Sequence, residues 1–254
     1  MPGPLVVIPT YNERENLATI VDRVRRAAPE ASVLVVDDAS PDGTGRLADE
    51  LTAADAAVHV LHRPGKMGLG AAYLDAFGWA MERGYDPIVQ LDADGSHRPE
   101  ELPALLAAFE GTDASGRPVG LVIGSRWVSG GRIENWPKHR EWLSRGGSVY
   151  VRRMLRLPTH DTTAGYRAFR ADALRRMELT DVHTRGYGFQ VDMLWHAREA
   201  GLGIVEVPVT FVERERGRSK MSLGIVFEAM AKVTVWGLRL RFGRARSARP
   251  QRSL

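Results

Sequence analysis

Short runs of apolar residues recur along the first hundred positions, and each is followed by a turn and a segment with helical spacing. The apolar runs lie at 5–8, 32–36, 58–61 and 88–91, and the helices between them begin near Glu13 and cover 44–54 and 71–83. Strands that alternate with helices in this way form βαβ units, whose strands run parallel. The pattern predicts an α/β fold with a mostly parallel central sheet flanked by helices. The carboxyl ends of its strands share one edge.

The rest of the chain continues the alternation less regularly. We predict helices at 99–109, 140–155, 172–178 and 189–200, strands at 119–124, 166–169 and 204–212, and a loop at 128–139. Pro208 interrupts the last strand, and because proline has no backbone N–H to donate, it indicates an edge position at that residue.

The segment 221–240 carries apolar residues at helical spacing, interrupted by Glu228 and Lys232. Charges in the middle of the segment oppose a membrane-spanning helix, so we predict a helix that packs on the core or lies in a membrane interface. The chain then ends in a run rich in arginine and free of acids. Such a tail favours contact with anionic lipid; the alternatives are nucleic acid or a solvated end.

The composition excludes some kinds of catalytic and metal-binding site. The chain has 254 residues, of which 44% are hydrophobic, so it can bury a full core in one domain. It has no cysteine, which excludes thiol catalysis, thiolate metal sites and disulfides. The first apolar run is too short for a signal peptide or a transmembrane span, and we expect a cytoplasmic protein.

Acidic residues follow two of the predicted strands. Asp38 follows the strand at 32–36, and Asp92 and Asp94 follow the strand at 88–91. Carboxylates at the end of a strand bind Mg²⁺ or Mn²⁺, although a short Asp-rich turn is the plainer reading. Arg126 follows the strand at 119–124, and arginine binds phosphate. Together these residues suit a nucleotide-sugar diphosphate.

Two neighbouring features stay open. The glycine-rich segment 65–70, GKMGLG, lacks the spacing of a phosphate-binding loop, so it is either a structural turn or a phosphate contact. His97 is either a polar loop residue or a ligand or base.

Five motifs occur in order along the chain. They are VVIPTYNERENL at 6–17, VVDDASPDGT at 35–44, LDADGSHRPE at 91–100, GSRW at 124–127 and FVERERGRSKMS at 211–222. The set resembles family 2 glycosyltransferases with a GT-A fold, specifically the catalytic-domain-only dolichol- or polyprenol-phosphate mannosyltransferases. The resemblance implies a GT-A (Rossmann-like) catalytic domain at 1–220, an amphipathic helix at 221–242 that is interfacial or core-packed, and a basic, disordered tail at 243–254.

The resemblance also implies roles for single residues in the donor site. The base and ribose of the nucleotide would contact Pro9, Tyr11, Glu13, Val36 and Asp38. The diphosphate would lie along Asp92, Ala93 and Asp94. The metal, Mg²⁺ or Mn²⁺, would be bound by Asp94 and by Ser96, which occupies a position where relatives often carry Gln. Phosphate contacts would come from Arg126, Arg214 and Lys220.

On the acceptor side, the resemblance implies that Arg126 and Arg145 face a lipid phosphate. The catalytic set would then be Asp94, Arg126, Arg145 and Arg214. Asp161, Arg167 and Gln190 match further family positions whose roles stay unassigned. The plainer readings place Arg145 on a helix surface and make Asp161 a cap of the following turn.

The implied reaction is an inverting transfer of mannose from GDP-mannose to a polyprenyl (dolichyl-type) monophosphate, giving a lipid-linked sugar donor. The acceptor is already anionic and needs little or no general base. The segment 214–220 would close over the diphosphate. Such a chain would lie on the cytoplasmic face of the membrane as a peripheral protein, reaching its lipid directly or through an integral membrane protein.

Two rival functions compete with this one. The first is a polyprenol-phosphate glucosyltransferase that uses UDP-glucose. The second is a non-catalytic module that binds lipid phosphate or a nucleotide sugar. Nucleic-acid binding is not expected, because the body of the chain does not interleave aromatic and basic residues.

Overall fold

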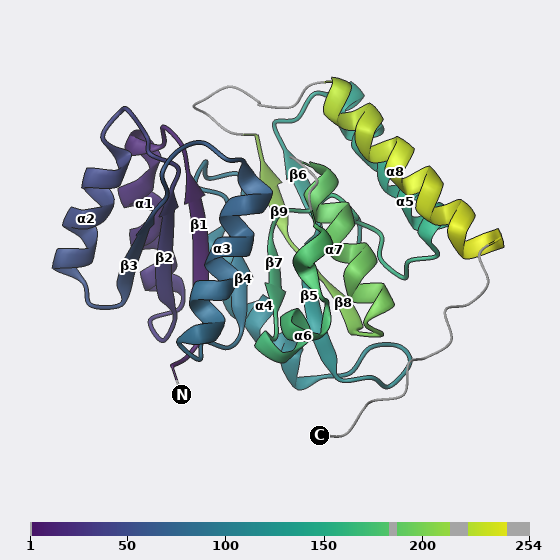
Figure 1. Ribbon diagram of the computed structural model, residues 1–254, viewed down its shortest axis with the longest axis horizontal. Helices are drawn as coiled ribbons and strands as arrows, with labels where there is room; N and C mark the ends of the chain where they lie inside the picture. Colours follow the sequence, from purple (N-terminus) through teal and green to yellow (C-terminus); the bar gives the residue numbers. More distant parts are fainter. Residues whose placement is uncertain (1, 183–186, 214–222, 243–254) are drawn as a thin grey trace.

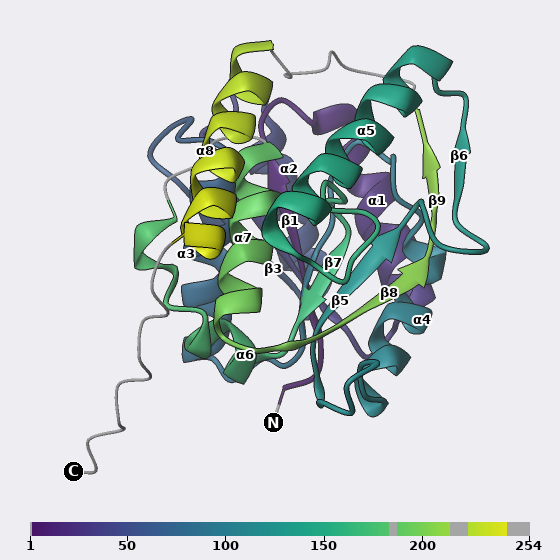
Figure 2. The same cartoon turned by 90° about the vertical axis from the view of Figure 1, so that its right-hand side faces the viewer.

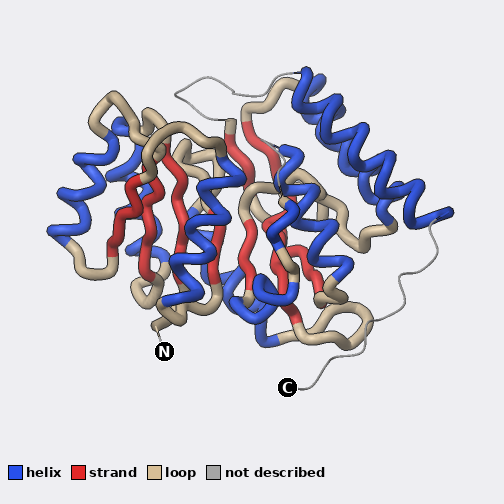
Figure 3. The backbone as a smooth tube through the Cα atoms, in the orientation of Figure 1, coloured by secondary structure: helices blue, strands red, loops and turns tan. Residues whose placement is uncertain are grey.

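The computed structural model of the protein describes residues 2–182, 187–213 and 223–242. A seven-stranded sheet in the order β3-β2-β1-β4-β7-β5-β8 forms the middle of the molecule, with helices on both faces (Figure 1, Figure 3). Its strands are β1 (Leu5–Thr10), β2 (Ser32–Asp37), β3 (Val58–His62), β4 (Ile88–Gln90), β5 (Val119–Ser125), β7 (Arg167–Phe169) and β8 (Gly203–Pro208).

The strand directions confirm a mostly parallel sheet. The first four strands pair in parallel, and β5 pairs in parallel with β8. The exception is β7, which runs antiparallel between β4 and β5. Because β7 runs against its neighbours, the loop that precedes it lies at their carboxyl edge. This brings the segment 161–166 to the same edge as the ends of β4 and β5.

Two apolar clusters cover the two faces of the sheet. Alternate residues of one strand face opposite layers, as in β1, where Leu5 and Val7 join one cluster while Val6 and Ile8 join the other. The first cluster packs against α3 (Leu69–Glu82), α5 (Lys138–Leu155), α6 (Ala171–Arg176), α7 (Tyr187–Glu199) and α8 (Leu223–Phe242). The second packs against α1 (Arg14–Ala27), α2 (Thr44–Ala54) and α4 (Leu102–Ala107).

The prediction of one strand over 204–212 is wrong, and so is the prediction of a pure loop over 128–139. Strand β8 ends at Pro208, and the chain leaves the large sheet to form β9 (Thr210–Val212). Strand β9 pairs in parallel with β6 (Arg132–Glu134) in a separate two-stranded sheet. The expected edge position of Pro208 is confirmed, because β8 is the last strand of the large sheet.

Helix α8 lies beside α5 and α7 (Figure 2), and contact of the same helix with a membrane interface stays a prediction. Val233 is buried, and Trp236 stacks on Trp195 with ring centroids 5.5 Å apart. Gly237 lets α8 approach α5 closely, because a Cβ atom there would lie 2.6 Å from Cε of Met154. Within the described part of the chain, no helix is long and apolar enough to cross a membrane.

Candidate active site

The carboxyl ends of β1, β2 and β4 lie together, as the winding predicted. Thr10 and Asp37 are paired in the register of β1 and β2, and the Thr10 hydroxyl donates to the Asp37 carboxylate at 3.0 Å. The backbone N–H of Asp38 donates to the carbonyl of Thr10 at 3.1 Å. The first residues of the predicted donor site therefore form one rim. Ligands of open α/β sheets bind at such a rim.

Asp38 holds the glycine-rich segment 65–70 in place. Its carboxylate forms a buried ion pair with Arg63 and accepts a hydrogen bond from the backbone N–H of Met67 at 3.2 Å. The residue before Met67, Lys66, places its ammonium 4.0 Å from the centre of the Tyr11 ring. The segment therefore packs beside two residues predicted to bind the nucleotide. Its role as a phosphate contact stays a prediction.

The other predicted nucleotide contacts lie on the same rim. Pro9 is half-buried at the end of β1, while Val36 is fully buried in β2. Glu13 precedes α1, where its backbone N–H donates to Thr44 and its carboxylate accepts from Asn16 at 2.9 Å.

The turn after β4 carries both aspartates of the predicted diphosphate site. The Asp94 carboxylate accepts a hydrogen bond from the backbone N–H of Ser96 at 3.0 Å, which fixes the turn. Burial, together with the charges of Asp92 and Asp94, raises the pKa of Tyr73 well above its ordinary value. The phenol therefore stays neutral at physiological pH. Ala93 is buried between the two acids.

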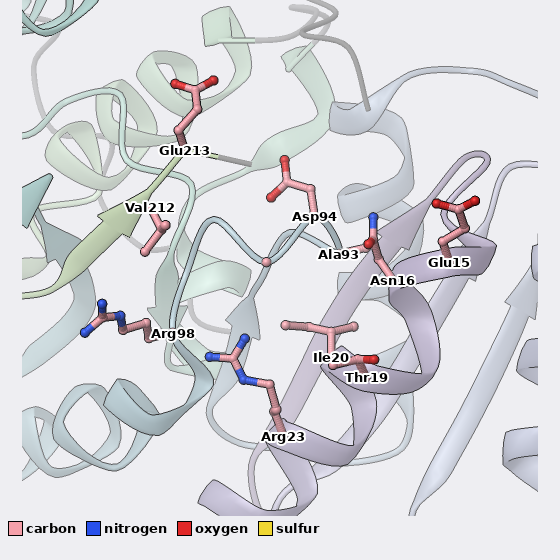
Figure 4. Close-up of a pocket in the computed structure, with 11 residues that line it drawn as sticks. Glu15, Asn16, Thr19, Ile20, Arg23, Ala93, Asp94, Arg98, Val212 and Glu213 are labelled. Atoms are coloured by element: carbon pink, nitrogen blue, oxygen red, sulfur yellow. The ribbon is translucent and has the colours of Figure 1, made fainter. Parts of the chain in front are cut away.

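A pocket of about 380 Å³ opens beside this turn (Figure 4). It lies between α1, the turn after β4 and the end of β9, and its polar lining includes Asn16, Arg23, Asp94, Arg98 and Glu213. Three of these side chains form ion pairs outside the turn: Arg23 with Glu100, Arg98 with Glu134 and Glu213 with Arg140. The pocket thus has a fixed charged wall and places Asp94 at its rim.

His97 is not a solvated loop residue. Its imidazole is buried between the rings of Tyr166 and Phe211, with centroids 5.2 and 5.3 Å away. Burial lowers the pKa of His97 to about 4, so the ring is neutral at physiological pH. The backbone bridge between His97 and Phe211 joins the turn after β4 to β9.

Arg126 is buried, and its guanidinium is held by Asp161. The two hydrogen bonds from Nε and Nη2 to the carboxylate oxygens are each 2.7 Å long. Nη2 also donates to the hydroxyl of Thr163 at 2.8 Å. Burial alone would raise the pKa of Asp161, but the charge and hydrogen bonds of Arg126 hold it below its ordinary value. Asp161 thus holds Arg126, a predicted phosphate contact, in place, which goes beyond the role of a turn cap.

Arg145 lies near Arg126 although the two are on different elements. The guanidinium of each lies over the ring of Trp127, at 4.8 Å from its centre for Arg145 and 5.1 Å for Arg126. The Arg145 side chain is 58% exposed, and its ion pair with Glu141 is long, at 3.5 Å. The structure therefore brings together the two arginines predicted for the acceptor phosphate.

Two further family positions are structural. Arg167 is fully buried in β7 and donates to the backbone carbonyls of Thr162, Ala164 and Gln190. Burial lowers the pKa of Arg167 to about 9, so it stays protonated at neutral pH. Arg167 thereby joins the loop 161–166 to α7. Gln190 is buried in the same place.

The sequence does not predict the side-chain contacts that hold Asp38, Arg126 and Arg145 in place. Arg63 and Trp127 were not singled out, and the pairing of Asp161 with Arg126 was not expected. Trp127 stood inside a recognised motif, GSRW, which could have marked it. Arg214 and Lys220 lie outside the described residues, so their predicted diphosphate contacts stay predictions.

The chain was compared with known sequences. The profile of Glycosyl transferase family 2 matches residues 5–177. An undecaprenyl-phosphate mannosyltransferase of Micrococcus luteus is 57% identical over 238 residues, which cover 94% of this chain and 95% of that protein. A polyprenol monophosphomannose synthase of Mycolicibacterium smegmatis is 54% identical over 244 residues, covering 95% and 89%.

Solved structures agree on the fold. Glucosyl-3-phosphoglycerate synthase from Mycobacterium tuberculosis, in complex with Mn²⁺, UDP and glucosyl-3-phosphoglycerate, is similar with a TM-score of 0.63 at 20% identity, over 97% of this chain and 82% of that one. A mannosyltransferase from Pyrobaculum calidifontis, in complex with GDP-Man and Mn²⁺, gives 0.58 at 19% identity, over 95% and 65%. The profile match, the two relatives and this shared architecture show that the protein belongs to glycosyltransferase family 2 and has a GT-A fold.

Proposed function

We propose that the protein transfers mannose from GDP-mannose to a polyprenyl monophosphate, with inversion at the anomeric carbon. The observation that carries this proposal is the identity of 57% and 54% to two mannosyltransferases of polyprenyl phosphates, along nearly the whole chain. The geometry agrees with it, because the acidic turn at Asp94 and the arginine pair at Trp127 lie at the same edge of the sheet. One part suits a diphosphate and a metal, the other an anionic acceptor.

A divalent metal, Mg²⁺ or Mn²⁺, fits the turn after β4. In the described residues, no group of three or more His, Cys, Asp or Glu side chains is placed to hold a metal ion. Mg²⁺ in nucleotide sites is commonly bound by one or two carboxylates and completed by substrate phosphates. Asp94 supplies a carboxylate at the pocket rim, and the Ser96 hydroxyl is buried with no partner among the described residues. When bound, the metal would neutralise the charge of the departing diphosphate.

The protein's own residues then have two tasks. The acceptor phosphate is already ionised, so it attacks without a general base. Arg126 and Arg145 hold that phosphate and reduce its repulsion from the donor diphosphate. Arg214 and Lys220 bind the diphosphate as it leaves. A single displacement by the acceptor oxygen, which breaks the bond to the diphosphate, gives inversion.

The acceptor lipid implies contact with a membrane, and α5 and α8 offer a surface for it. Large apolar side chains stand exposed on both helices, among them Trp142 at 76% and Phe242 at 82% exposure. Arg145 and Arg239 are exposed on the same two helices. Apolar residues mixed with cations are typical of interfacial binding to anionic lipid. We place the protein on the cytoplasmic face of the membrane, alone or with an integral membrane protein.

The decisive experiment measures organic-extractable label from GDP-mannose, UDP-glucose and UDP-N-acetylglucosamine with farnesyl phosphate or a longer polyprenyl phosphate. The assay is run with Mg²⁺ or Mn²⁺ for the wild type, Asp94→Asn and Asp22→Asn, an exposed acid on α1 that serves as control. We expect label from GDP-mannose alone and a loss of about a hundredfold or more in Asp94→Asn only. Label transferred from UDP-glucose instead would show that the donor is UDP-glucose and not GDP-mannose. If the protein binds a nucleotide sugar or the lipid phosphate but transfers no label from any donor, the result would favour the non-catalytic binding module.

A further inference from the structure

We infer that Trp127 is a further acceptor-binding residue, whose indole N–H donates a hydrogen bond to the phosphate monoester held between Arg126 and Arg145. This inference rests on the proposed function, since it names a residue of the acceptor site. Trp127 lies two residues after the last residue of β5, Ser125, and its backbone N–H donates to the hydroxyl of Ser125 at 3.3 Å, which fixes Trp127 near the strand end.

The first observation is the indole N–H itself. Nε1 of Trp127 is buried and has no hydrogen-bond partner among the described residues. An indole N–H can only donate, and a buried donor without an acceptor costs about 1–3 kcal/mol. Natural structures keep such a donor where water or a ligand supplies the acceptor. The groups around this N–H therefore indicate which kind of acceptor it would bind.

The second observation is the charge around the ring. Arg126 and Arg145 both place their guanidinium groups over Trp127, at 5.1 and 4.8 Å from its centre. A ligand that accepts from the indole N–H would lie at the edge of a ring that has two cations over it. Such a set of donors favours an acceptor-only anion, and a phosphate monoester is one. Guanidinium groups also lie well over aromatic rings, so Trp127 spaces the two arginines.

The neighbouring carboxylates do not cancel this preference. Asp161 binds Arg126 through two oxygens, and both side chains are buried. Glu141 is 3.5 Å from Arg145, a long contact between partly exposed side chains that contributes little. Arg145 can therefore turn to a phosphate, while Arg126 stays in place. Trp127 links the fixed arginine to the exposed one.

The neighbouring Trp136 provides a matched comparison. Its ring also lies under two arginines, Arg126 at 5.6 Å and Arg140 at 5.1 Å. Arg140, however, is paired through two contacts of 2.7 and 3.0 Å with Glu213. Trp136 thus has the same indole ring as Trp127 and shares Arg126 with it, but its second cation is Arg140 where that of Trp127 is Arg145. A Trp→Phe change at each site separates the indole N–H of Trp127 from a general need for tryptophan.

The test uses indole N–H signals of ¹⁵N-tryptophan-labelled full-length protein, titrated with farnesyl phosphate, inorganic phosphate, farnesol or GDP. The chain has six tryptophans, and the Trp127 signal is assigned by its absence in Trp127→Phe. If that variant does not fold, the other five Trp→Phe variants assign it by elimination. We expect the Trp127 signal to move downfield with farnesyl phosphate, weakly with inorganic phosphate, and to stay in place with farnesol and GDP.

Kinetics give the second readout. Trp127→Phe is expected to raise the KM for farnesyl phosphate about tenfold or more, the effect of one lost hydrogen bond to a charged group, with the KM for the nucleotide sugar changed less than about twofold. Trp136→Phe should leave both constants within about twofold. A Trp127 signal that stays in place while farnesyl phosphate binds, or equal effects of the two variants, would overturn the inference. Failure of wild type to bind any prenyl phosphate would instead overturn the proposed function.

Discussion

The carboxylate of Asp161 holds the guanidinium of Arg126 through two hydrogen bonds of 2.7 Å, and both side chains are buried. The two residues are 35 positions apart, on the end of β5 and on the loop before β7. They meet because β7 runs antiparallel between β4 and β5, which carries that loop to the carboxyl edge of the sheet. A charged arginine is thereby fixed at the rim where the acceptor phosphate is proposed to bind.

Replacing Asp161 with Asn should be strongly destabilising. The change leaves the buried charge of Arg126 without its counter-charge, which costs about 3–5 kcal/mol in the free energy of unfolding. Thr163→Ala is the matched control, because it removes one hydrogen bond from the same guanidinium to an uncharged hydroxyl, worth about 1.5–3 kcal/mol, and leaves the counter-charge in place. Urea titration measures both. Equal small losses for the two variants would contradict the importance of the ion pair.

The pair of Asp161 and Arg126 also predicts how the free energy of unfolding depends on pH. The pKa of Asp161 is lower in the folded protein than in the unfolded chain. Its contribution to stability is therefore complete above its ordinary pKa, near 3.8, and is lost as the pH falls through the folded-state value. Below about pH 4, the free energy of unfolding should fall less steeply in Asp161→Asn than in the wild type. Parallel acid curves would contradict this.

Arg63 should matter for donor binding without touching the donor. Arg63→Met leaves the Asp38 carboxylate buried without its partner and frees the segment 65–70, at a cost of about 3–5 kcal/mol. We expect a raised KM for the nucleotide sugar and an unchanged KM for the acceptor. Asp75→Asn is the control: Asp75 pairs with the same arginine at 2.8 Å but is 55% exposed, so its loss should cost less than about 1 kcal/mol.

The sequence predicts a structural feature well when the residues that form it lie close together along the chain. The strands β1 to β4 were predictable because each carries its own apolar run and turn within a few positions. The acids at their ends then share a rim by geometry alone, so Asp38, Asp92 and Asp94 could be placed without a structure.

Pairs from distant segments could not be predicted in this way. Arg63 and Asp161 are ordinary charged residues in loops, and the sequence does not name their partners. The strands β6 and β9 are three residues each and pair with one another in a separate small sheet, and three residues are too few to show a strand pattern. His97 reads as polar from its neighbours, yet the rings of Tyr166 and Phe211, far along the chain, bury it.

His97 should stabilise the turn that carries Asp94. His97→Ala removes the ring between Tyr166 and Phe211 and leaves a cavity, with an expected loss of about 2–4 kcal/mol in the free energy of unfolding. The loosened turn should also raise the concentration of Mn²⁺ needed for half-maximal transfer. His62→Ala is the control, since that side chain is 51% exposed and should change both quantities little. An unchanged metal requirement in a folded His97→Ala protein would count against this link.

The surface of α5 and α8 gives the last prediction. Flotation with vesicles of phosphatidylglycerol should recover the wild type, and vesicles of phosphatidylcholine should recover less, because the cations on both helices favour anionic lipid. Trp142→Ser and Phe242→Ser should each lower the partition coefficient about tenfold, since each removes an aromatic side chain that would enter the interface.

Two controls separate this surface from other sources of binding. Met67→Ser makes a similar change at an apolar side chain that is 58% exposed in the segment 65–70, next to β3 at the opposite edge of the sheet from β8 (Figure 1). It should not alter flotation. Deletion of 243–254 tests the basic tail by itself, while raised salt should weaken the charge-dependent part of binding. If Trp142→Ser and Phe242→Ser float like the wild type while the tail deletion does not, the membrane contact lies in the tail and α5 and α8 serve another partner.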